Sequence, residues 1–144
     1  MFSKACEYGI RASSYIALQS LEKRRVSLKE IAAEIDSPVA FTAKILQQLS
    51  KHHIIDSVKG ATGGFEIQRD RINTIKLSEI VYAIDGDKVY MSCVLGLKKC
   101  NAIHPCPVHD KFMKIRGNLK HMLEGTSLYD MTKGLEVGLT NLKH

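Results

Sequence analysis

The chain has 144 residues, of which 44% are hydrophobic, and it carries a formal net charge of +6. This apolar fraction is sufficient for the core of one ordinary domain, so the composition argues against a disordered chain. The positive charge favours an anionic partner, with nucleic acid first, although a basic soluble protein without such a partner has the same composition.

Charged residues interrupt the N-terminal segment from Lys4 onward, which argues against a secretory signal. No apolar run approaches the roughly 20 residues that a membrane-spanning helix needs. A cytoplasmic location without membrane attachment is therefore expected, and thiols are normally kept reduced there. The four cysteines are accordingly expected to be ligands or sensors rather than structural disulfides.

A first helix is predicted over residues 2–22, because apolar or small side chains recur there at helical spacing. Cys6 lies on the apolar face and is expected to be a small buried side chain. Glu7 lies off that face.

The next segment predicts two helices in close succession. Ser27 and Glu30 form a capping-box pattern, and the helix that follows ends near Asp36. Ser37 is a favourable N-cap and Pro38 a favourable first residue, so a third helix is expected over residues 38–52. Two helices joined by so short a turn indicate a helix-turn-helix motif. The polar face of the third helix suits the DNA major groove, although a solvated helix face has the same composition.

A β-hairpin is predicted over residues 56–69, where two short extended runs surround a glycine-rich turn. A hairpin directly after a helix-turn-helix is the order of elements in winged-helix proteins. Lys59 and Arg69 flank the turn and are placed to reach phosphates. The glycines also have the simpler interpretation of serving a tight turn.

A fourth helix around residues 77–84 completes a winged helix-turn-helix DNA-binding domain over residues 1–84. Residues 110–135 contain a further helix whose apolar stripe needs a partner, and a second subunit is the economical choice. Residues 136–144 are expected to fray. The predicted fold class is mainly α with a small β-hairpin, a winged helix-turn-helix followed by a long C-terminal dimerisation helix.

Residues 85–109 form a loop that concentrates soft metal donors, with three of the four cysteines at Cys93, Cys100 and Cys106 and with His104 and His109 beside them. Thiolates select zinc, copper(I) or iron–sulfur clusters. A structural zinc site is one interpretation, although zinc ligands usually come in closer pairs. A metal-free thiol switch is another. We find no phosphate-binding glycine motif and no nucleophile–base pair with a known signature, so an enzyme is not expected.

Three stretches followed by the three-cysteine loop identify a family resemblance. They read VSLKEIAAEIDSP, AKILQQLSKHHIIDSVKGATGGF and LSEIVYAIDG. In this order they resemble the bacterial iron–sulfur-cluster transcriptional regulators of the IscR and NsrR type, over nearly the whole chain. The resemblance implies a homodimer that binds a pseudo-palindromic operator in double-stranded DNA, with the long C-terminal helix pairing against its mate.

The resemblance also implies the metal ligands. The three loop cysteines would hold an iron–sulfur cluster at Cys93, Cys100 and Cys106, with a 2Fe–2S cluster favoured over 4Fe–4S and zinc as the alternative. The fourth ligand is His109 in an IscR-like arrangement and Glu7 in an NsrR-like one, and we prefer His109 because imidazole is the better soft-metal ligand. Glu7 would otherwise be an exposed helix carboxylate. Such clusters are oxygen-labile, so one can be lost during aerobic purification.

Two departures from the family pattern bear on function. The spacing from Cys93 to Cys100 is one residue longer than usual, and Ala43 stands where IscR has a glutamate, so the operator preference of IscR does not transfer. The function expected is operator binding controlled by a cluster that senses redox state, nitric oxide or cluster supply. The residues expected to contact DNA are Ser37, Thr42, Ala43, Lys44, Gln47, Lys51, Lys59, Gly60, Thr62 and Arg69.

Overall fold

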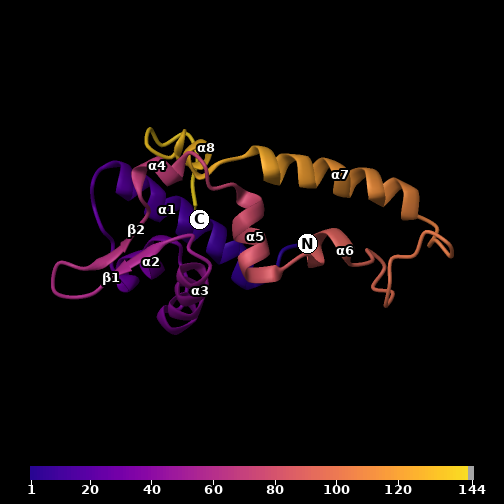
Figure 1. The fold of residues 1–144 in the computed structure, drawn as a ribbon, viewed down its shortest axis with the longest axis horizontal. Helices are drawn as coiled ribbons and strands as arrows, with labels where there is room; N and C mark the ends of the chain where they lie inside the picture. The colour runs from indigo at the N-terminus through magenta and orange to yellow at the C-terminus, as the bar shows by residue number, and fades with distance from the viewer. Residues whose placement is uncertain (143–144) are drawn as a thin grey trace.

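The computed structural model describes residues 1–142, and these residues form a compact winged unit from which one long helix extends (Figure 1). The extending helix is α7 (His109–Gly125), and the short helix α6 (Lys88–Met91) contacts it. The one sheet in the described residues is a two-stranded hairpin, and the other elements are helices. The predicted class, mainly α with a small β-hairpin, is therefore confirmed.

Helix α1 (Lys4–Leu21) runs through the middle of the winged unit and packs against α3, α5 and α8. Ser3 caps its N-terminus by accepting a hydrogen bond from the Cys6 N–H at 3.0 Å. Cys6 is 0% exposed, which confirms the prediction that it is a small buried side chain. The Ser3 N–H donates to Asp85 Oδ2 at 2.9 Å, which ties the start of α1 to the end of α5 (Leu77–Asp85).

Helix α2 (Leu28–Glu34) begins at the cap that the sequence predicts, but only half of the predicted capping box forms. Ser27 Oγ accepts a hydrogen bond from the Glu30 N–H at 3.2 Å. The Glu30 carboxylate forms an ion pair with Arg24 in the preceding turn instead of accepting a hydrogen bond from the Ser27 backbone N–H. The ion pair links the basic turn after α1 to the first turn of α2.

Helix α3 (Val39–Lys51) follows α2 after a short turn, so the helix-turn-helix is present. The prediction that Ser37 caps α3 is wrong, because Pro38 occupies the N-cap position and offers no side-chain hydrogen bond. Ser37 Oγ instead forms a hydrogen bond with Thr42 Oγ1 at 2.9 Å. The start of α3 is therefore held by a side-chain pair within its first turn.

The wing consists of β1 (Asp56–Val58) and β2 (Gly64–Glu66), which pair antiparallel with Ser57 opposite Phe65. Val26 pairs with β2 through an isolated bridge that the sequence pattern did not predict. Its N–H donates to the Phe65 carbonyl at 3.1 Å, and the Phe65 N–H donates to the Val26 carbonyl at 2.8 Å. The turn between α1 and α2 is thereby joined to the wing.

The remaining elements of the winged unit are α5 and the single-turn helix α4 (Arg69–Ile72). Arg69 therefore begins a helix. The predicted hairpin boundaries placed it on the wing, and this placement is wrong. The core that holds these elements together is formed by fully buried aliphatic side chains, among them Ile16, Ile31, Ile45, Leu46, Leu49 and Ile80.

The apolar stripe of α7 is only partly covered. Leu123, near its C-terminal end, is 1% exposed, whereas Ile115 is 50% exposed and Met122 is 45% exposed. Helix α7 packs against α5 and α6 along one side. Ile115 and Met122 are therefore apolar surface that the other elements among residues 1–142 leave uncovered.

Helix α8 (Leu128–Thr132) brings the chain back onto α1 through Leu128, which is 0% exposed. Residues 136–142, part of the segment that is expected to fray, form turns after α8, and the Leu142 carbonyl accepts a hydrogen bond from Arg11 Nη1 at 3.2 Å. Residues 143 and 144 of that segment lie outside the described residues. Across residues 1–142, no helix combines the length and apolar character that crossing a membrane requires.

We predict that Gly64→Ala lowers the free energy of unfolding by about 1–3 kcal/mol. Gly64 has a φ of 139°, and a β-carbon there would lie 2.7 Å from the Val26 carbonyl oxygen. Urea denaturation followed by circular dichroism measures the change. Gly60→Ala is the matched control, because Gly60 has a φ of 105° but open space around it. Equal losses in the two variants would contradict the role of the Val26 contact.

Candidate nucleic-acid interface and cysteine site

The outward face of α3 carries three of the residues expected to contact DNA. Lys44, Gln47 and Lys51 are exposed on successive turns, and Ala43 beside them is half-buried. Small and long polar side chains on one helix face can reach base edges and phosphates.

Thr42 is predicted to contact DNA, but the structure buries it. It is 0% exposed, and its hydroxyl donates to the Pro38 carbonyl at 2.8 Å, so it faces the core side of α3. Its spacing of three and four residues from Ile45 and Leu46 is the signal that identifies the apolar face, although its hydroxyl suggested the polar one. Ser37 is half-buried and is engaged with Thr42, so it lies behind the exposed face.

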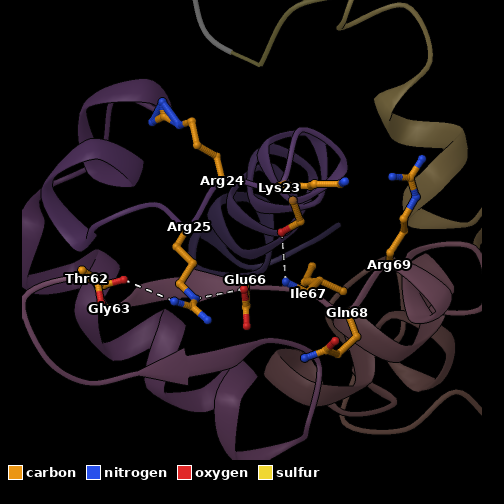
Figure 2. Close-up of a pocket in the computed structure, with 10 residues that line it drawn as sticks. Lys23, Arg24, Arg25, Thr62, Gly63, Glu66, Ile67, Gln68 and Arg69 are labelled. Atoms are coloured by element: carbon orange, nitrogen blue, oxygen red, sulfur yellow. Dashed lines mark hydrogen bonds and ion pairs between the residues drawn. The ribbon is translucent and has the colours of Figure 1, made fainter.

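The wing tip presents Lys59, Gly60 and Thr62 to solvent. Arg69 is also exposed, at the start of α4. Figure 2 shows Arg69 and Thr62 on opposite sides of the same cleft, with the basic turn after α1 above them.

The basic turn is the part of this surface that the sequence interpretation missed. Lys23, Arg24 and Arg25 all line the cleft, and the run of three consecutive cations was the available signal. Figure 2 shows the Arg25 side chain directed at the wing, where its Nε donates to Glu66 Oε2 at 3.0 Å. Its Nη1 donates to the Thr62 carbonyl at 3.3 Å.

The cysteine loop lies between α6 and α7 and brings its donors together in pairs. Cys100 Sγ lies 3.3 Å from Nδ1 of His109, the first residue of α7. The Cys93 thiol interacts with that of Cys106. All three loop cysteines are free and partly exposed. In the described part of the chain, no three His, Cys, Asp or Glu side chains stand at metal-binding separation.

The ionisation of the thiols differs between the loop and the core. Hydrogen bonds from the Leu97 and Leu95 backbone lower the pKa of Cys93, with smaller contributions from Cys106 and from the positive charge of Arg116. Burial, reinforced by Asp85, raises the pKa of Cys6 to about 12. The loop thiol is therefore the more nucleophilic of the two at neutral pH.

Glu7, the alternative fourth ligand, is exposed on α1, and its carboxylate pairs with Lys4 Nζ at 3.4 Å. Among the described residues, His109 contacts a loop cysteine, Cys100, whereas Glu7 is paired with Lys4.

The profile of the Rrf2 family, described as iron-dependent transcriptional regulators, matches residues 2–134. The chain belongs to the Rrf2 family. A relative from Aquifex aeolicus, described as an HTH-type transcriptional regulator, is 32% identical over 133 residues, covering 91% of this chain and 90% of the relative. The regulator IscR of Photorhabdus laumondii is 24% identical over 130 residues, covering 90% of this chain and 77% of IscR.

Solved structures of two regulators share the Rrf2 fold of this chain. IscR of T. potens matches with a TM-score of 0.73 and 24% identity, covering 97% of this chain and 91% of that one. CymR, the global cysteine regulator of B. subtilis, matches with a TM-score of 0.74 and 19% identity, covering 92% of this chain and 96% of that one. The predicted family and winged-helix fold are thus confirmed. The chain is a transcriptional regulator and not an enzyme.

In this Rrf2 chain one further residue contacts the cysteine site, and the sequence interpretation missed it. Arg116 of α7 is 7% exposed, its Nη1 lies 3.5 Å from Cys100 Sγ, and its guanidinium lies 5.5 Å from the Phe112 ring centroid. Its Nε is buried without a hydrogen-bond partner. Arg116 lies on the same apolar stripe of α7 as Phe112 and Leu119. A cation is unusual on such a stripe, so its position was the sequence signal for a buried arginine.

The donor chemistry of the site fits the metal centre that the family description suggests. Three thiols and an imidazole suit iron–sulfur clusters or zinc. Thiolate ligands would add negative charge next to Arg116, which forms no ion pair with a carboxylate among residues 1–142. A buried cation of this kind needs a nearby anion.

We predict that iodoacetamide alkylates Cys93 in the folded protein at least about a hundredfold faster than Cys6, because the thiolate is the reactive form and the two pKa values lie on opposite sides of 9.0. Mass spectrometry of peptides after timed quenching measures the two rates. Unfolding in urea, where burial no longer acts, should bring them together. Equal rates in the folded protein would contradict the assigned environments.

Proposed function

We propose that this Rrf2 regulator is a homodimer that binds a pseudo-palindromic DNA operator, and that an iron–sulfur cluster at Cys93, Cys100 and Cys106 controls the binding. His109 is the proposed fourth ligand. The observation that carries the proposal is the contact of Cys100 with His109, because it joins the cysteine loop to the first residue of α7.

The proposed dimer uses the uncovered side of α7. Ile115 and Met122, seven residues apart, are exposed on one face of this helix, and a second α7 packed against them would remove their apolar surface from water. A two-fold dimer also matches the symmetry of a pseudo-palindromic operator.

Control of DNA binding follows from the position of the loop in the chain. Cys93 comes shortly after α6, and His109 begins α7, so ligands from both ends of the loop fix α7 relative to the winged unit. When bound, an iron–sulfur cluster supplies a redox-sensitive link among these side chains. Because α7 is the proposed dimer helix, its angle sets the separation of the two α3 helices. A change in that separation alters the fit to successive major grooves.

A metal-free thiol switch is the second candidate. The interaction of Cys93 with Cys106 and the lowered pKa of Cys93 favour it, because a reactive thiolate beside a second thiol can form a disulfide when a peroxide or another disulfide accepts the two electrons. The solved fold of the cysteine regulator CymR is similar, and an oxidized form of the Staphylococcus aureus protein of that name is also known. A structural zinc site uses the same donors.

We predict that protein purified without oxygen is brown and contains iron and sulfide, and that Cys100→Ala bleaches it. Visible absorption with iron, sulfide and zinc assays measures this. Cys6→Ala is the control, because it removes a buried thiol outside the loop and should leave the colour unchanged. His109→Ala should destabilise the chromophore more than Glu7→Gln. Colourless protein containing zinc, or no metal, would overturn the cluster proposal and favour one of the alternatives.

We predict that Lys44→Ala and Gln47→Ala each weaken binding to the duplex that the wild-type protein enriches from a random-sequence pool. Removing a base contact costs about 1–3 kcal/mol, whereas removing a phosphate contact lowers the salt dependence. Fluorescence anisotropy at several salt concentrations measures both effects. Lys111→Ala, which removes an exposed charge on α7, should have little effect. Unchanged affinity in both α3 variants would contradict the assignment of α3.

A further inference from the structure

We propose that the cleft between the α1–α2 turn and the wing binds backbone phosphates of the DNA that flanks the segment contacted by α3. The inference rests on the proposed DNA binding and extends it to an element outside the helix-turn-helix and the wing. A contact with phosphates alone would add affinity and lengthen the footprint on DNA, and it would not add base specificity.

The cleft has a volume of about 550 Å³ and is built from three structural elements. The α1–α2 turn contributes Lys23, Arg24 and Arg25, the wing contributes Thr62, and α4 contributes Arg69. Figure 2 shows these side chains arranged around a common opening, with Lys23 and Arg69 on adjacent sides of it.

The charge of the cleft favours an anion. Four cationic side chains line it, and Glu66 is its one carboxylate. Arg25 is paired with Glu66 and Arg24 with Glu30. Lys23 and Arg69 form no ion pair within residues 1–142, and both are exposed. Two uncompensated cations and the exposed edge of Arg24 are thus available to phosphate oxygens.

The turn and the wing are held together as one surface. The two Arg25 hydrogen bonds cross from the turn to Glu66 and Thr62, and backbone hydrogen bonds in both directions join Val26 to Phe65. When the wing approaches DNA, the turn therefore approaches with it. A pre-positioned cation loses less conformational entropy on binding than one on an independent loop.

The position of the cleft identifies which phosphates it would meet. Figure 1 shows the α1–α2 turn and the wing at the end of the winged unit away from α7. If the two subunits meet through α7, this end points outward along the DNA. A wing in the minor groove has a phosphate strand on each side. The α1–α2 turn lies beside the wing and can meet the outer strand.

The test compares Lys23→Gln/Arg24→Gln with Lys111→Gln/Lys114→Gln, which removes the same charge from exposed positions on α7. The probe is the duplex that the wild-type protein enriches from a random-sequence pool, used with its flanks and trimmed to its core. We expect the turn variant to lower the slope of log affinity against log salt by about 0.9 for each phosphate that it no longer neutralises. Hydroxyl-radical footprinting should show loss of protection at the outer edges alone.

Three outcomes would overturn the proposal. They are an unchanged salt slope and footprint in the turn variant, an equal loss in the α7 control, or an equal loss on the trimmed duplex. Arg69→Gln provides a second variant on another element, and it should reduce the same outer protection.

Failure of this inference is separable from failure of the proposed function. If Lys44→Ala weakens binding while the turn variant behaves like the wild type, the DNA-binding function stands and the cleft has no part in it. If the wild-type protein enriches no duplex under any metal or redox condition, the proposed function itself is wrong.

Discussion

The close packing of α1 against α5 is the constraint on which the rest of the structure depends. Gly9 lies in the middle of α1, and a β-carbon there would overlap the end of the Ile84 side chain of α5. The absence of a side chain lets the two helices approach, and Ile45 of α3 lies against the same point. Helices α3 and α5 are therefore both positioned by α1. The hydrogen bond from Ser3 to Asp85 adds a polar link at the end of this contact.

Most helices of the winged unit could be predicted because their stability comes from apolar side chains at helical spacing, as at Ile45, Leu46 and Leu49. The single-turn helices α4 and α6 could not, because so few residues contain no full period. The pairing of Val26 with the wing was missed for a related reason. Val26 forms only one bridge, and its partner Phe65 is distant in the sequence.

In the candidate sites, too, some features follow from the local sequence and others only from how the helices pack. The cysteine spacing and the cationic face of α3 are visible in the sequence, and so the donors and Lys44 could be named. The inward position of Thr42 also follows from its spacing to Ile45 and Leu46, but the hydrogen bond to the Pro38 carbonyl that satisfies its buried hydroxyl is seen only in the structure. The proximity of Cys100 to Arg116 requires α7 to lie beside the loop, which no local pattern encodes.

The buried position of Arg116 has a thermodynamic consequence for the loop. Under the proposed function, thiolate ligands beside Arg116 would compensate the positive charge of its guanidinium, which has lost its contact with water. Without a neighbouring anion, the guanidinium is a cation held in an apolar setting against Phe112, and this costs free energy. Arg116 belongs to α7, so the proposed cluster would act on this helix as well as on the loop.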